Sequence, residues 1–259
     1  MSDSVESKLE AFSALQIYPT ILWASQLQPE VMERINGVFI DKIDQARAVR
    51  PDLRPEGKCQ TDQRLHTIPE LAEFCDLVTG LARHILDTDH IRYQDIRITG
   101  CWANIGYPGS QHTAHIHPNN YFSGVYYVAA PPGGNTITFI DPRPQAGVMV
   151  PPGTQMSPRT AQKMTLDVRP GSLLLFPAWL FHSVGVNKAD VERISVAFNL
   201  MFTPYSEDMS APLWKGNSGP NQSPKMIPAA LPPTLLTRIS AFSVPRSASS
   251  TPANVSMNK

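Results

Sequence analysis

The chain has 259 residues and a mass of 28.6 kDa, enough to bury a sizeable core, and we favour one domain over two small ones. With 22 basic and 22 acidic residues its net charge is zero, which argues against a nucleic-acid or acidic-membrane partner and favours a small molecule, with a homodimer left open. No signal peptide or long apolar run is present and the three cysteines are widely spaced, so we expect a cytoplasmic protein without a disulfide framework.

The first part of the chain carries mostly helical patterns. Apolar side chains recur at helical spacing over residues 5–14 and 28–48, and the run over 17–23 between them predicts a strand. A third helix is predicted over residues 68–87, which begin with a proline in the first turn. We interpret residues 1–92 as a helical and strand support for the segment that follows.

From about residue 96 the apolar pattern changes to a period of two, which is typical of half-buried strands. Short apolar runs alternate there with turns rich in proline and glycine. The predicted strands are Ile96–Ile105, Tyr121–Val128, Thr136–Ile140, Lys163–Val168, Ser172–Phe176 and Arg193–Phe202. Strands at this spacing favour an antiparallel barrel or a double-sheet jelly roll. The fold class expected is therefore an all-β core with flanking helices.

After the last predicted strand the pattern fades into a stretch rich in proline, serine and asparagine. One helix fits residues 234–242, and the end from about Val244 has little to bury, which predicts a disordered or loosely draped tail. We therefore divide the single structural domain into a support over 1–92, a jelly-roll core over 93–204 and a C-terminal extension over 205–259.

Three histidines are spaced to bind one metal ion. His115 and His117 stand two residues apart where a strand enters a turn, and such residues point to the same face of a strand. His182 follows another predicted strand, and a returning chain can bring it beside the first pair. Imidazole suits Fe(II), Zn(II), Cu(II) and Ni(II), and three ligands on one face leave open positions, which indicates catalysis. Surface or core roles are the simpler interpretation of His66, His84, His90 and His112.

Arg193 and Ser195 lie on the last predicted strand and share one of its faces. A buried arginine facing the interior needs an anion, and its planar fork matches a carboxylate, with the serine hydroxyl as an added donor. An internal salt bridge to an aspartate or glutamate is the alternative.

With these motifs the sequence resembles the iron(II)/2-oxoglutarate-dependent oxygenase superfamily, and within it a branch with a His-x-His...His metal motif. Five motifs over about residues 100–202 carry the resemblance: His115–Pro118, Ser123–Tyr127, Asp141–Arg143, Phe176–His182 and Arg193–Asn199. It implies a double-stranded β-helix, a jelly roll also described as a cupin-like barrel, that uses Fe(II), 2-oxoglutarate and O2. It also implies that His115, His117 and His182 are the catalytic metal ligands. Arg193 and Ser195 would hold the distal carboxylate of 2-oxoglutarate.

The sequence departs from the superfamily at one ligand, because His117 stands where an aspartate or glutamate is usual. A neutral imidazole there leaves an Fe(II) site one charge unit more positive. Asp141 is an alternative source of a carboxylate ligand, although its place in a predicted turn also suits pairing with Arg143.

The function expected from the resemblance is oxidation of an unactivated C–H bond of a small molecule by hydroxylation, desaturation or oxidative cyclisation. Asn104 and Tyr127 are expected to position the cosubstrate. Residues that would position the substrate are Arg143, Tyr126 and Trp179, and Arg143 would suit a carboxylate, which favours an amino acid or a secondary-metabolite intermediate.

Two alternative functions remain open on sequence. The spacing from Gly109 to His117, and from Gly171 to His182, nearly meets the cupin pattern, so a 2-oxoglutarate-independent three-histidine dioxygenase is one. A non-catalytic metal-binding jelly roll is the other. Oxygen consumption separates the binding protein from the enzymes, and dependence on 2-oxoglutarate separates the two enzymes.

Overall fold

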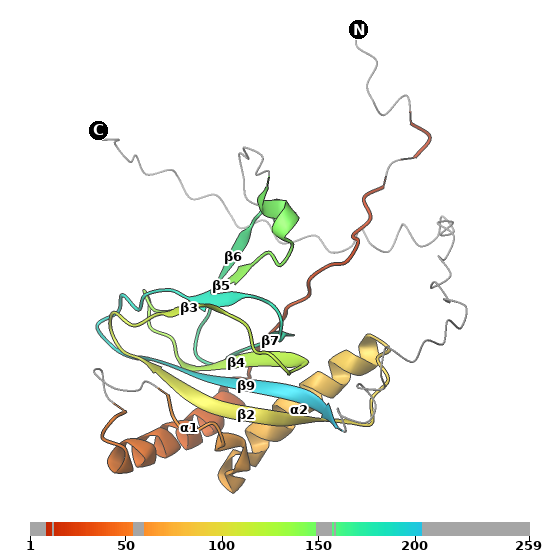
Figure 1. Ribbon diagram of the computed structural model, residues 1–259. Helices are drawn as coiled ribbons and strands as arrows, with labels where there is room; N and C mark the ends of the chain where they lie inside the picture. The colour runs from red at the N-terminus through yellow and green to blue at the C-terminus, as the bar shows by residue number, and fades with distance from the viewer. Residues whose placement is uncertain (1–8, 12, 54–59, 149–156, 158, 204–259) are drawn as a thin grey trace, which may run out of the picture. The chain divides into compact units, whose positions relative to one another are not determined.

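The computed structural model describes residues 9–11, 13–53, 60–148, 157 and 159–203, all within one compact unit (Figure 1). Two helices, a five-stranded sheet and a four-stranded sheet form three layers in this part of the chain. The predicted C-terminal extension and its helix lie outside the described residues, so our division into three segments stays a prediction. No helix in the described ranges is both long and apolar enough to span a membrane.

Both sheets are antiparallel throughout. The larger sheet has the spatial order β1 (Trp23–Gln26), β7 (Ser172–Pro177), β4 (Phe122–Ala129), β9 (Arg193–Thr203) and β2 (Asp95–Gly106). The smaller sheet has the order β3 (His112–His115), β8 (His182–Val184), β5 (Thr136–Ile140) and β6 (Lys163–Asp167). Apolar side chains from both sheets pack into a shared core that includes Tyr127, Phe139 and Phe176. Of the two predicted architectures, the double-sheet jelly roll is the one observed.

Helices α1 (Pro29–Val49) and α2 (Ala72–Thr88) cover the outer face of the larger sheet (Figure 1). In α1 the buried side chains are Ile35, Phe39 and Ile43, whose spacing of four places them on one stripe. Phe39 packs edge-on against Phe74 of α2, with ring centroids 4.9 Å apart. Both helices were predicted, over residues 28–48 and 68–87.

Strand β9 shows how the sheet separates two environments. Ile194, Val196 and Phe198 belong to the core beneath the helices. Arg193 and Ser195 line a cavity between the sheets instead. Successive side chains of a strand point to opposite faces, so the alternation read from the sequence places the polar pair inside the jelly roll.

Several predicted boundaries are wrong. The described residues of the segment 5–14 form no helix, and the strand expected over 17–23 begins only at Trp23, where pairing with β7 starts. Two 3-10 turns, Leu65–Thr67 and Pro69–Leu71, precede α2, which therefore begins later than residue 68.

Candidate active site

Three histidines converge from two strands of the smaller sheet and the turn that follows one of them. His115 ends β3, His182 begins β8, and these two residues are paired partners in the register of the sheet. His117 lies just beyond β3 and is held by a hydrogen bond from its backbone N–H to the carbonyl oxygen of Ala178, 2.9 Å away. One ring nitrogen from each histidine lies within 4.8 Å of the other two. The turn after β3, rather than strand periodicity, brings His117 to this point.

Backbone carbonyls orient two of the three imidazoles. Nδ1 of His115 lies 2.8 Å from the carbonyl oxygen of Thr113, and Nδ1 of His182 lies 2.9 Å from that of Leu180. A carbonyl can only accept, so Nδ1 is the donor in both rings, which leaves Nε2 as the nitrogen available to a metal ion. Such an arrangement is typical of imidazoles that bind a metal through Nε2.

Burial disfavours the protonated, positively charged form of His117 and His182. It lowers the pKa of His117 to about 4, and a positive charge on His115 would lower it further. It also lowers the pKa of His182 to about 4, against the opposing effect of the hydrogen bond to Leu180. Both rings are therefore neutral near pH 7, which is the form that a metal ion needs.

The histidines line a small cavity of about 60 Å³ between the two sheets. Its wall is formed by Gln60, Trp102, Asn104, His112, His115, His117, Gly124, Val125, Tyr127, Ile137, Phe176, His182, Val184, Arg193, Ser195 and Ala197. No aspartate or glutamate is among these described residues. The guanidinium of Arg193 is a permanent positive charge in this wall.

Arg193 is buried without an acidic partner. Its side chain is 3% exposed, and Nη1 donates a hydrogen bond of 3.1 Å to the carbonyl oxygen of Gly134. None of the ion pairs within the described ranges involves it, so the alternative of an internal salt bridge is not observed. Desolvation lowers its pKa, although arginine remains charged. A buried cation of this kind is strongly stabilised by an anion in contact with it.

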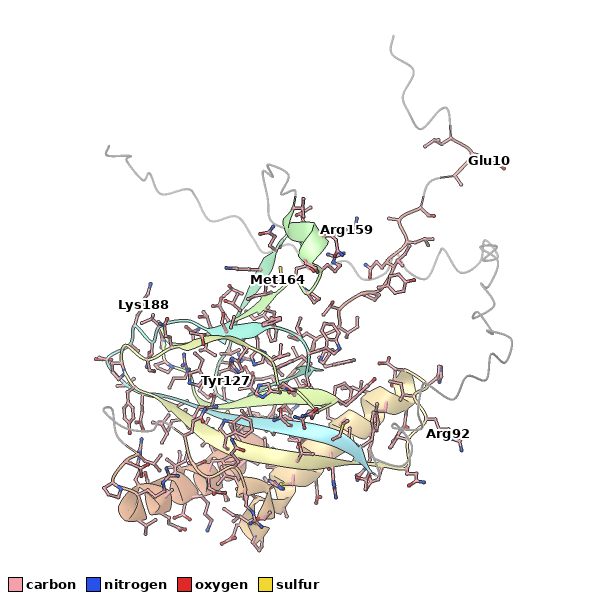
Figure 2. The ribbon with its side chains drawn as sticks, in the orientation of Figure 1. Glu10, Arg92, Tyr127, Arg159, Met164 and Lys188 are labelled. Atoms are coloured by element: carbon pink, nitrogen blue, oxygen red, sulfur yellow. The ribbon has the colours of Figure 1, made fainter. Side chains whose placement is uncertain are left out.

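Two further predicted residues share the cavity. Tyr127 points between the sheets (Figure 2), and its hydroxyl is buried without a hydrogen-bond partner among the described residues. Asn104 has its Oδ1 occupied, because it accepts from Gln60 Nε2 at 2.8 Å and from Trp102 Nε1 at 3.2 Å. A buried hydroxyl without a partner carries a desolvation penalty that a ligand can relieve.

The three residues expected to contact substrate do not line the cavity. Tyr126 lies on the face of β4 opposite to that of Tyr127, so its ring packs against α1 and α2. Its hydroxyl donates a hydrogen bond of 2.7 Å to Asn36 Oδ1. Trp179 lies in the turn after β7 and is 52% exposed. The guanidinium of Arg143 makes two hydrogen bonds to Asp141, at 2.7 and 3.0 Å.

The ion pair with Arg143 also shows which role Asp141 has in the structure. Hydrogen bonds from Arg143 lower the pKa of its carboxyl, and Asp141 is not part of the ligand cluster found in the described ranges. The pairing role expected for a turn aspartate is therefore the one observed.

Two polar residues of the cavity wall were not predicted to belong to the site: Gln60 and His112. His112 starts β3 and lines the cavity, and burial lowers its pKa, with Arg193 and His115 contributing in the same direction. Ser110, which was not predicted either, is not one of the lining residues, but its hydroxyl lies close to the guanidinium of Arg193. The spacing from His112 to His115 gives no face in common on a strand, which is why the pattern did not favour it.

The fold and the site together define a class of protein: a jelly roll with a three-histidine cluster and a buried, unpaired arginine in one cavity. A family model described as "Putative 2OG-Fe(II) oxygenase" matches residues 100–199. No curated protein matches the chain in sequence.

Solved structures give the same relation at the level of the fold. The non-heme alpha ketoglutarate dependent epimerase SnoN from nogalamycin biosynthesis is 13% identical, with a TM-score of 0.51 over 71% of this chain and 77% of that one. HygX from Streptomyces hygroscopicus, solved with nickel and 2-oxoglutarate bound, is 14% identical, with a TM-score of 0.51 over 71% of this chain and 83% of that one. The predicted resemblance to the iron(II)/2-oxoglutarate oxygenases and their jelly-roll fold is confirmed.

Proposed function

We propose that this chain is an Fe(II)- and 2-oxoglutarate-dependent oxygenase that oxidises an unactivated C–H bond of a small molecule. One observation carries the proposal: the cavity that collects three imidazoles also contains Arg193, a buried cation without an acidic partner. A metal ion and a carboxylate are the two ligands that these groups would bind.

The charges of the cavity support this pair of ligands. Fe(II) on three neutral histidines carries two positive charges and Arg193 adds a third, while the described wall supplies no carboxylate. 2-Oxoglutarate brings two negative charges, and one of its carboxylates can lie near the metal while the other meets Arg193. Because His117 stands where a carboxylate ligand is usual, the negative charge that balances the site would come from the cosubstrate.

Each residue has a distinct task in this proposal. His115, His117 and His182 would hold Fe(II), and Arg193 and Ser195 would hold the distal carboxylate of the cosubstrate. When bound, Fe(II) and 2-oxoglutarate supply O2-dependent oxidation of C–H bonds, coupled to decarboxylation of the cosubstrate to succinate. Tyr127 and Asn104 would orient the cosubstrate, and the apolar part of the wall keeps bulk water away. Hydroxylation, desaturation and oxidative cyclisation all begin with cleavage of a substrate C–H bond.

Support for the substrate class comes from the comparisons. SnoN and the carbocyclase SnoK, which is 11% identical with a TM-score of 0.51 over 71% of this chain and 80% of that one, both come from nogalamycin biosynthesis. Their small-molecule setting favours a secondary-metabolite intermediate. The amino-acid alternative loses its expected anchor, because Arg143 is paired with Asp141 outside the cavity wall.

The metal ligands are tested by removing one imidazole at a time. We expect His115→Ala and His182→Ala to lose stoichiometric Fe(II) binding, because two remaining nitrogens hold Fe(II) much more weakly. Metal content after anaerobic dialysis measures this, beside thermal melts. His84→Ala, at an exposed position of α2, is the matched control and should bind like the wild type. Stoichiometric Fe(II) in either site variant would contradict the assignment.

The cosubstrate is tested through Arg193. Arg193→Lys keeps the charge but loses the planar fork, so 2-oxoglutarate should bind about ten- to a hundred-fold more weakly, equivalent to about 1.5–3 kcal/mol, and Arg193→Ala should be worse. Anaerobic titration of the Fe(II)-loaded proteins, followed by the visible charge-transfer band, measures this, with Arg83→Lys as an exposed control.

Two results would contradict the oxygenase proposal. One is equal affinity for 2-oxoglutarate in the wild type and both Arg193 variants. The other is no binding by the wild type. Oxygen consumption that proceeds without 2-oxoglutarate would instead favour the three-histidine dioxygenase.

A further inference from the structure

The loop after β2 brings a serine hydroxyl close to Arg193. A Cβ atom placed on Gly106 would stand 2.9 Å from Arg193 Nη2 and 3.2 Å from Ser110 Oγ. The guanidinium and this hydroxyl therefore lie close to the same point. Ser110 Oγ is buried and has no hydrogen-bond partner among the described residues.

The backbone fixes this hydroxyl in place. Ser110 N–H donates to the carbonyl oxygen of Tyr107 at 3.0 Å, which closes a tight turn with Pro108 and Gly109 at its centre. Gly109 has a φ of 81°, a value that suits glycine in the third position of such a turn. The position of Ser110 is thus set by the turn and does not depend on its own side chain.

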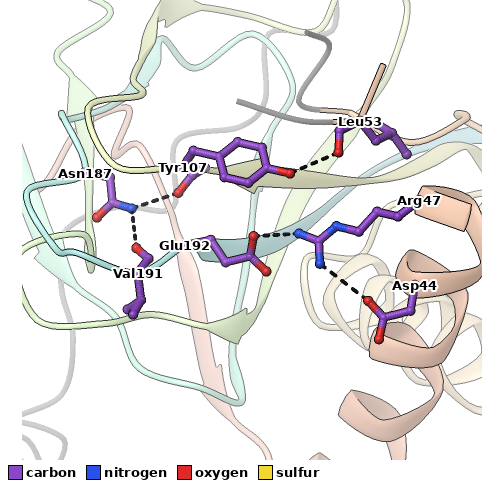
Figure 3. A network of polar contacts seen from close by, with 8 residues as sticks. Asp44, Arg47, Leu53, Tyr107, Asn187, Val191 and Glu192 are labelled. Carbon is purple, nitrogen blue, oxygen red and sulfur yellow. Dashed lines mark hydrogen bonds and ion pairs between the residues drawn. The ribbon is translucent and has the colours of Figure 1, made fainter. Parts of the chain in front are cut away.

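Hydrogen bonds of Asn187 hold this turn against the end of β2. Asn187 is 1% exposed, and its side chain donates to the carbonyl oxygens of Gly106 and Val191, at 2.8 and 2.9 Å (Figure 3). Its backbone N–H donates to the carbonyl oxygen of Ser110, and its carbonyl oxygen accepts from Gly109 N–H, both at 2.8 Å. A buried residue with four such bonds holds the loop rigidly.

We propose that the Ser110 hydroxyl donates a hydrogen bond to the same carboxylate that Arg193 binds, and so acts as a second hydroxyl anchor beside Ser195. The inference rests on the proposed function and adds a residue to the cosubstrate site. A carboxylate has about four lone-pair positions, and one N–H of Arg193 is already used by Gly134. Ser110 supplies one of the donors that would otherwise be missing.

The test compares two five-carbon 2-oxo acids on Fe(II)-loaded protein without oxygen. 2-Oxoglutarate has the distal carboxylate, and 2-oxopentanoate lacks it. Ser110→Ala should weaken binding of 2-oxoglutarate about ten-fold or more, because a hydrogen bond to a charged group is lost, and should leave the affinity for 2-oxopentanoate unchanged. The iron content should remain that of the wild type.

Ser172→Ala is the matched control, because Ser172 Oγ already has hydrogen-bond partners, among them Gln26 Oε1 at 3.0 Å. It should lower the melting temperature and leave both affinities unchanged. Ser110→Ala should melt at or above the wild-type temperature, since the ligand-free protein gains nothing from that hydroxyl.

The outcomes separate this inference from the proposed function. If the wild type binds 2-oxoglutarate and Ser110→Ala binds it equally well, the inference is overturned while the oxygenase proposal stands. An equal loss for both 2-oxo acids, or a large fall in melting temperature, would show a structural role and also overturn it. If the wild type binds no 2-oxoglutarate, both fail together.

Discussion

At the scale of single residues, Gly106 decides where the guanidinium of Arg193 can lie. Its missing side chain leaves the space that Arg193 Nη2 and Ser110 Oγ occupy, at 2.9 and 3.2 Å from the position of a Cβ. Contacts this short force one partner to move, and the far end of an arginine moves more easily than a strand. A side chain at position 106 would therefore displace the guanidinium of Arg193 and not the strand.

We therefore expect Gly106→Ala to remain folded and to bind 2-oxoglutarate at least ten-fold more weakly, with iron binding intact. Anaerobic titration and thermal melts measure the two effects. Gly37→Ala in α1 is the control, because no atom lies within 4 Å of its Cβ position, and it should stabilise the protein by about 0.5–1 kcal/mol. Unchanged cosubstrate affinity in Gly106→Ala would mean that the guanidinium is not confined there.

At the scale of elements, β4 lies between β7 and β9 and has no room for a side chain at Gly124. A Cβ there would lie 2.8 Å from the carbonyl oxygen of Leu174 and would overlap the ring of Phe198. That ring is 1% exposed and packs against Phe74 of α2, with centroids 5.6 Å apart. Neither the strand nor the ring has room to withdraw.

Gly124→Ala should consequently destabilise the whole sheet, by about 1–3 kcal/mol or more, in contrast to Gly106→Ala. Urea denaturation followed by circular dichroism measures the free energy of unfolding of both variants. If Gly124→Ala unfolds at the same urea concentration as the wild type, the interpretation that Gly124 has no room for a side chain is wrong.

The elements also show what a sequence can reveal. Long strands such as β9 alternate polar and apolar residues over 11 positions, so both the strand and its cavity face were predictable. Strands β3 and β8 have 4 and 3 residues, too few for a period to be read. The end of β3 was inferred only from its histidine pair, and β8 was not predicted. Ser110 could not be predicted, because its role depends on a turn that tertiary hydrogen bonds bring beside Arg193.

At the scale of the described unit, two hydrophobic cores serve different purposes. One lies between the helices and the larger sheet and contains Phe39, which is fully buried. The other lies between the two sheets and contains Phe176, which is 1% exposed and packs edge-on against His182 with ring centroids 4.8 Å apart. Only the second core touches the cluster of histidines.

Truncating one phenylalanine in each core should therefore separate stability from metal binding. Phe39→Ala and Phe176→Ala should each cost about 3–5 kcal/mol of folding free energy, because both leave a cavity in a close-packed core. At a temperature well below both melting points, Phe39→Ala should bind Fe(II) like the wild type, since Phe39 has no contact with the histidines. Phe176→Ala should bind Fe(II) about ten-fold more weakly, because the ring that holds His182 in its orientation is gone. Competition with a chromophoric chelator measures both affinities on equal terms. Equal weakening in the two variants would show that metal affinity follows global stability and not the packing of the inner core around His182.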